Sequence, residues 1–245
     1  MRRLWICWFI GLHMLVAIVL VKSDFLPRVG RKIGILPPVY RYSSKVPAER
    51  LQIFYERVDK NVPEGSVFVI GDSLVHGLCV PALFAREGFP VAVGFGIGGD
   101  TLDGITTRLK RLNSKDSASA IVLQGGINDL LNGADDEEFK CRYIAMLNEI
   151  PHGVPFIAVM LFPLVESKAG ITNSRIAELN KWMTATVAKR PNGAVCDLTC
   201  MLADPRNGCL LNNYHIGDGL HLNKKGNDIF LLGLRRCLAE VCNGR

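Results

Sequence analysis

Residues 66–74 read SVFVIGDSL, a short apolar run that ends in a glycine followed by two polar residues. Further apolar runs follow at residues 90–93, 120–123, 155–161 and 194–196. Segments with helical spacing of their apolar residues accompany these runs, at 48–61, 78–87, 102–112, 135–149, 172–189 and 224–242. Short strands that are apolar on both faces and alternate with helices predict a parallel sheet with helices on both sides.

We therefore expect an α/β fold with three layers (α/β/α), flavodoxin-like, around a five-stranded parallel sheet of order 2-1-3-4-5. Ligands bind such sheets at the carboxyl ends of the strands. Residues that directly follow an apolar run are thus the first candidates for a site. Asn173 and Asn223 are expected to cap the last two long helices.

The N-terminus predicts a membrane segment. No residue from Leu4 to Val21 is charged, and an 18-residue helix spans about 27 Å, close to the ~30 Å core of a bilayer. Arg2 and Arg3 precede this stretch, and residues 21–23 make a poor cleavage site. We expect residues 1–21 to be an uncleaved signal anchor, with a cleaved signal peptide as the alternative.

The formal net charge of +6 lies entirely in the first 42 residues, which carry seven bases and one acid. Residues 22–48 contain several prolines and predict a basic linker, so that the folded domain would span residues 49–245. Because the folded part is neutral, nucleic acid is not an expected partner. Bases that flank an apolar segment fit a membrane surface better.

Eight cysteines are present, and the seven outside the apolar segment are an odd number. We expect the cysteines to be buried or loop thiols, and the alternative is a small disulfide loop closed by Cys200 and Cys209. The chain has no C-x-x-C motif, and the pair Cys196 and Cys200 lacks a second pair with suitable histidine spacing. We expect no metal site.

Ser73 follows the first apolar run at a sharp strand-to-helix turn, where a nucleophile is exposed and its backbone N–H lies at a helix start. The alternative is that Ser73 only caps the helix. After the second run, residues 94–101 read GFGIGGDT and contain G-x-G-x-x-G. A dinucleotide fingerprint belongs after the first strand, so we favour glycines that direct a backbone N–H at a developing oxyanion.

The third run is followed by GGIND at residues 125–129, in which the Asn128 amide is able to donate to an oxyanion. Its alternative role is that of a turn residue. Residues 218–221 read DGLH, so Asp218 is placed to orient His221 as a general base. His76 is expected to be a wall residue, and His152 and His215 to be ordinary loop residues.

These motifs, in this order, resemble those of the SGNH hydrolases, also called GDSL esterases and lipases, over roughly residues 65–235. The resemblance implies Ser73 as nucleophile with Asp218 and His221 as its partners. It also implies an oxyanion hole formed by Ser73, Gly99 and Asn128. The stretch IGGDT at residues 97–101 looks most like the thioesterase/lysophospholipase and acetylhydrolase branches.

The expected function is that of a serine esterase, which hydrolyses lipid-like or acetyl esters through an acyl-enzyme and needs no metal or organic cofactor. The alternatives are an O-acyltransferase acting on an envelope glycan with the same triad, and a non-catalytic binding module. Apolar residues after the strands are expected to line the acyl pocket: Leu78, Phe95, Leu130, Leu131, Leu164 and Val165.

The expected partners are a small-molecule or lipid ester and, through residues 4–21, a membrane. The catalytic domain is then expected to be anchored on the extracytoplasmic side, or secreted if the signal is cleaved. The sequence specifies no oligomeric state.

Overall fold

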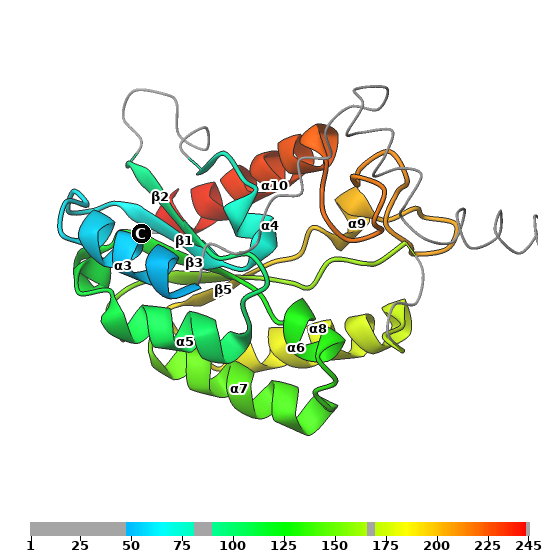
Figure 1. The fold of residues 1–245 in the computed structure, drawn as a ribbon, viewed down its shortest axis with the longest axis horizontal. Helices are drawn as coiled ribbons and strands as arrows, with labels where there is room; N and C mark the ends of the chain where they lie inside the picture. Colours follow the sequence, from blue (N-terminus) through cyan, green and yellow to red (C-terminus); the bar gives the residue numbers. More distant parts are fainter. Residues whose placement is uncertain (1–47, 81–89, 166–169, 244–245) are drawn as a thin grey trace, which may run out of the picture. The chain divides into compact units, whose positions relative to one another are not determined.

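The computed structural model describes residues 48–80, 90–165 and 170–243 (Figure 1). The predicted anchor at 1–21, the predicted linker apart from Ala48, and most of the helix expected at 78–87 lie outside these ranges. Within them, no helix combines the length and apolar character that are needed to cross a membrane.

Five parallel strands form one sheet in the order β2-β1-β3-β4-β5, which confirms the predicted topology. The strands are β1 (Val67–Gly71), β2 (Ala92–Gly96), β3 (Ala120–Gln124), β4 (Phe156–Val159) and β5 (Gly193–Cys196). Gly71, at the end of β1, pairs with Gly96 of β2 and with Gln124 of β3. The segments that follow these three strands therefore leave the sheet at the same edge.

Helices cover both faces of the sheet (Figure 1). One face carries α3 (Ala48–Asp59), α5 (Leu102–Arg111), α6 (Ile127–Leu131), α7 (Asp136–Asn148) and α8 (Asn173–Val187). The other carries α4 (Ser73–His76), α9 (Thr199–Leu202) and α10 (Lys224–Asn243). A short 3₁₀ helix, η2 (Ser114–Ser117), precedes β3.

β2 continues to Gly96, beyond the apolar run predicted at residues 90–93, and includes two glycines of the motif. A Cβ at Gly96 would lie 2.3 Å from the backbone nitrogen of His76, so only glycine lets α4 pack this closely on β2. The G-x-G part of the motif is therefore used for packing between a strand and a helix, and β2 ends before the remaining glycines.

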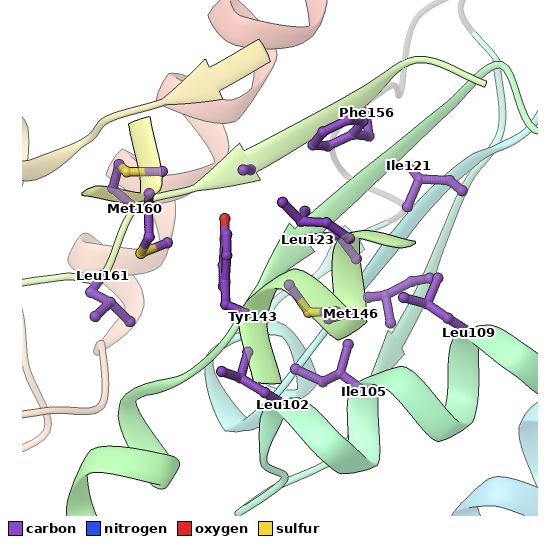
Figure 2. Close-up of a cluster of buried hydrophobic side chains, with 14 of the residues drawn as sticks. Leu102, Ile105, Leu109, Ile121, Leu123, Tyr143, Met146, Phe156, Met160 and Leu161 are labelled. Carbon is purple, nitrogen blue, oxygen red and sulfur yellow. The ribbon is translucent and has the colours of Figure 1, made fainter. Parts of the chain in front are cut away.

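The core consists of two apolar clusters, one on each face of the sheet. In β1, Phe68 and Ile70 belong to one cluster and Val67 and Val69 to the other, as the two-residue period of a strand requires. Figure 2 shows the first cluster, in which α5 and α7 pack against β3 and β4. Each such side chain contributes roughly 1.5–3 kcal/mol when it is buried.

The predicted helix caps are half right. Asn223 accepts a hydrogen bond from the Gly226 N–H at 3.1 Å, at the start of α10. The cap of α8 is Thr172, which accepts from Arg175 at 3.2 Å. Asn173 instead hydrogen-bonds both the N–H and the carbonyl of Leu164, each at 2.8 Å. Its amide thus fixes the segment after β4, a tertiary role that local sequence does not reveal.

A disulfide joins Cys196 at the end of β5 to Cys237 on α10, with the two Cα atoms 5.8 Å apart. The Cys200–Cys209 pair, which the sequence allowed as an alternative, is not formed, and both of these thiols are free. The reason is tertiary, because α10 packs on β5 and brings together two cysteines that are 41 residues apart.

Reduction of this disulfide is expected to destabilise the domain. The chain-entropy model gives roughly 4 kcal/mol for a crosslink that closes a loop of about 40 residues. Urea unfolding with and without dithiothreitol measures the difference. The exposed free thiol of Cys200 provides the control, since Cys200→Ala should leave both transitions in place. Equal stability of the oxidised and reduced protein would contradict the assignment.

Candidate active site

Ser73 is the first residue of α4, directly after the β1 turn. The cap of this helix is Asp72, whose Oδ1 accepts from the Leu74 N–H at 2.9 Å. The interpretation of Ser73 as a helix cap is therefore wrong, and its hydroxyl is used elsewhere. Ser73 Oγ lies 2.9 Å from Nε2 of His221, 148 residues further along the chain.

Asp218 and His221 lie in the loop before α10. Asp218 Oδ2 is 2.5 Å from Nδ1 of His221, and its Oδ1 accepts the backbone N–H groups of Leu220 and His221. Burial alone would raise the pKa of Asp218, but these hydrogen bonds outweigh it and hold the pKa below its usual range. A carboxylate in this position favours the tautomer with hydrogen on Nδ1, which leaves Nε2 free to accept the Ser73 proton.

Two loops beside Ser73 hold the expected oxyanion donors. Gly99 has a φ of +77°, a conformation that glycine adopts readily, and the preceding Gly98 N–H donates to His76 Nδ1 at 3.2 Å. Asn128 Nδ2 donates to the carbonyl of Asp100 at 2.8 Å. One N–H of the Asn128 amide thus holds the Gly99–Asp100 loop, and the amide has a second N–H to donate.

Arg108 of α5 joins the end of β1 to the Gly99–Asp100 loop. The side chain is 1% exposed, and its guanidinium donates to Asp100 Oδ2 at 2.6 Å and to the Gly71 carbonyl at 2.9 Å. Gly71 directly precedes Asp72 and Ser73, so one buried cation fixes two of the site's turns relative to each other. The sequence motifs do not include Arg108. Its signal was an arginine three residues after Ile105, on the buried face of α5.

Asp129 makes a second tie between the loops. Its side chain is fully buried and accepts from the Leu102 N–H at 2.9 Å and from Arg142 at 3.1 Å. Burial raises the pKa of Asp129, and the two hydrogen bonds oppose that rise. Asp129 therefore anchors the start of α5, while its neighbour Asn128 anchors the loop before it.

Asp72 is completely buried, and its Oδ2 has no hydrogen-bond partner among the residues the structure describes. Burial raises the pKa of Asp72 to about 7, against the lowering effects of the Leu74 N–H and of the charges on His221 and Arg108. Ser73 is therefore directly preceded by a buried carboxyl group that ionises less readily than an exposed one.

The residues expected to line the acyl pocket differ in their burial. Phe95, Leu130 and Leu164 are at most 1% exposed and pack in the first apolar cluster, so they do not line an open pocket as expected. Leu78 is buried in the second cluster. Leu131 and Val165 are only partly buried and stay predicted contacts. A residue that lies near the end of a strand turns either into the apolar core or toward the site. Its position in the sequence does not show which of the two it does.

Comparison with known proteins agrees with this geometry. The model of the GDSL-like lipase/acylhydrolase family matches residues 69–229. A candidate platelet activating factor from Streptococcus pneumonia is 21% identical, with a TM-score of 0.69, over 77% of this chain and 91% of its own. A GDSL-like lipase from Bacteroides thetaiotaomicron is 18% identical, with a TM-score of 0.63, over 77% and 97%.

A carbohydrate esterase of family 3 from Talaromyces cellulolyticus is 16% identical, with a TM-score of 0.58, over 74% of this chain and 98% of its own. A search of curated protein sequences finds no match. The fold and the family model define the class: the chain belongs to the GDSL-like lipase/acylhydrolase family. Membership supports ester hydrolysis as its general activity.

Arg108→Met is expected to lower the free energy of unfolding by about 3–5 kcal/mol, because it leaves Asp100 and the Gly71 carbonyl without their buried partner. Arg111→Met on the same helix is the matched control. Arg111 is 55% exposed and pairs with Glu56, so its loss should change stability by no more than about 1 kcal/mol. Urea unfolding of both variants makes the comparison, and equal effects would contradict the role of Arg108.

Asp72→Asn is expected to remove a pH dependence of stability. The pKa of Asp72 is about 7 in the folded protein and 3.8 when unperturbed, so the folded state binds more protons between these values. Its contribution to stability is complete below the lower value and is lost as pH rises through 7. Asn keeps an acceptor for the Leu74 N–H.

The variant should therefore gain stability relative to the native protein between pH 4 and pH 8, by up to roughly 4 kcal/mol, since each pKa unit corresponds to about 1.4 kcal/mol. Urea unfolding at both pH values measures this change. A constant difference between the two proteins across the range would show that Asp72 is not perturbed.

Proposed function

We propose that this protein is a serine esterase that cleaves carboxylic esters through an acyl-enzyme. The observation that carries the proposal is the chain of contacts from Ser73 Oγ to His221 Nε2 and from His221 Nδ1 to Asp218. It supports transfer of the Ser73 proton to His221 as Oγ attacks the ester carbonyl. His221 then protonates the departing alcohol, and a water molecule activated by His221 releases the acid.

The tetrahedral intermediate would place its oxyanion near the N–H groups of Ser73 and Gly99 and the amide of Asn128. The hydrogen bond from Asn128 to the Asp100 carbonyl supports this role, because it preorganises the amide beside the Gly99 loop. A single donor of this kind typically lowers the barrier by about 3 kcal/mol.

Small acyl groups, acetyl above all, are the proposed substrates. Phe95, Leu130 and Leu164, which were expected to line the acyl pocket, are packed in the core, and the loss of these three lining residues supports a short acyl site. A carbohydrate esterase that is 16% identical has a similar fold. A lysophospholipid, or another ester with a long acyl chain, is the competing substrate class.

An extracytoplasmic location is proposed for the domain. The Cys196–Cys237 disulfide supports it, because such bonds persist in oxidising compartments and are rare in the cytosol. The charge pattern around residues 4–21 supports an anchor, or a signal peptide, that delivers the domain there.

Ser73→Ala is expected to reduce hydrolysis of p-nitrophenyl acetate by at least 10³-fold, since it removes the nucleophile. Ser174→Ala, at an exposed serine on α8, is the control and should keep full activity. A fluorophosphonate probe should label the native protein and not the Ser73 variant. Undiminished turnover by Ser73→Ala would remove this mechanism, and absence of labelling in the native protein would favour a binding module.

The acyl preference is tested with p-nitrophenyl esters from acetyl to dodecanoyl, compared by kcat/KM. We expect the acetyl ester to be the best substrate and activity to fall steadily with chain length. A maximum at eight carbons or more would contradict the short acyl site and favour a lipid ester. Formation of an acylated sugar in place of free acid, when a glycan acceptor is added, would favour the transferase.

A further inference from the structure

We propose that His215 is a positioning residue, whose ring holds the loop that carries Asp218 and His221. The inference rests on the proposed function, since it assigns a task within the same site. The contacts of the His215 side chain with its own loop carry the inference, since His215 belongs to no sequence motif.

The Nδ1 atom of His215 accepts two backbone hydrogen bonds, from Gly217 at 2.9 Å and from Gly219 at 3.2 Å. These residues flank Asp218 on both sides. Gly217 and Gly219 have φ values of +102° and +76°, conformations that few residues other than glycine adopt. The two left-handed glycines shape a tight tip whose N–H groups converge on a single acceptor.

The base of this loop is closed by backbone pairing. His215 and Leu222 form an antiparallel bridge, and the Ile216 N–H donates to the His221 carbonyl at 3.0 Å. Asn223 adds a hydrogen bond to the His215 carbonyl at 3.1 Å. The backbone of His215 therefore belongs to the fixed base, and its side chain reaches from that base to the tip.

The oxygens of Asp218 cannot take over this task. Oδ1 accepts the N–H groups of Leu220 and His221, and Oδ2 contacts the His221 ring. Val165 adds one hydrogen bond to the tip from outside, from its N–H to the Gly219 carbonyl at 3.2 Å. That contact satisfies the carbonyl of Gly219, whereas the N–H groups of Gly217 and Gly219 donate to His215.

The two nitrogen atoms of the His215 ring have different surroundings. With Nδ1 as the acceptor, a neutral ring carries its hydrogen on Nε2, and that atom is buried without a partner among the described residues. The ring thus leaves one buried polar atom unsatisfied while it satisfies two backbone donors. Removing the acceptor would free Asp218, and with it the alignment of His221 on Ser73.

The test compares two amides that differ in reach. In His215→Asn, the side-chain oxygen takes nearly the position of Nδ1, whereas in His215→Gln it lies near the position of Nε2. We expect the Asn variant to keep kcat for p-nitrophenyl acetate within about threefold of the native value. The Gln variant should lose roughly 10- to 100-fold in kcat with KM little changed, because small displacements of a catalytic group have effects of this size.

His215→Leu, which has no acceptor, should behave like the Gln variant. His152→Leu, at an exposed histidine far along the chain, is the control and should match the native protein. The rate of fluorophosphonate labelling at Ser73 gives a second readout and should fall in parallel with kcat. Thermal unfolding of each variant shows whether the domain is folded at the assay temperature.

Equal activity of the Asn and Gln variants, whether both high or both low, would overturn the proposal. The proposal requires a hydrogen-bond acceptor at the position of Nδ1, and only the Asn variant keeps one there. The proposed function fails separately, if Ser73→Ala stays active. Loss of activity in Ser73→Ala together with full activity in His215→Gln would leave the esterase intact and reject only the role of His215.

Discussion

The in-register pairing of β1 with both β2 and β3 is the constraint on which the site depends. It brings Gly71, Gly96 and Gln124 level with one another, so that the three following turns begin at one edge. The turns carry Ser73, Gly99 and Asn128, which lie far apart in sequence. A slip of register in either pair would separate Ser73 from the loops of Gly99 and Asn128.

Pairing alone places the turns only approximately, and buried polar contacts fix them. Arg108 joins Asp100 to the end of β1, Asn128 holds the Asp100 carbonyl, and Asp129 holds the start of α5. Charges buried this deeply stabilise a fold only when their partners are well placed. Here these buried contacts hold the turns in defined positions relative to one another. A site in which several hydrogen-bond donors converge requires such positioning.

The loop that carries Asp218 and His221 is instead held largely by contacts within itself. Asp218 binds two N–H groups of its own loop along with the His221 ring, and His215 binds the glycines on either side. The loop is joined to the sheet edge through Val165 and through the contact between Ser73 and His221. The Cys196–Cys237 disulfide fixes α10, which follows the loop, to β5.

The apolar periodicity of neighbouring residues was enough to predict the strands and their order. The sequence also associated Ser73 with Asp218 and His221, through the order of its motifs and the family that they resemble. It did not determine the disulfide, the cap of α8, the burial of Phe95 or the parts played by Arg108 and His215. Each of these depends on which distant segments meet, and on whether a side chain beside a strand end turns into the core or toward the site. These outcomes depend on the packed tertiary structure, because each contact stabilises the protein only when folding has brought its two partners together.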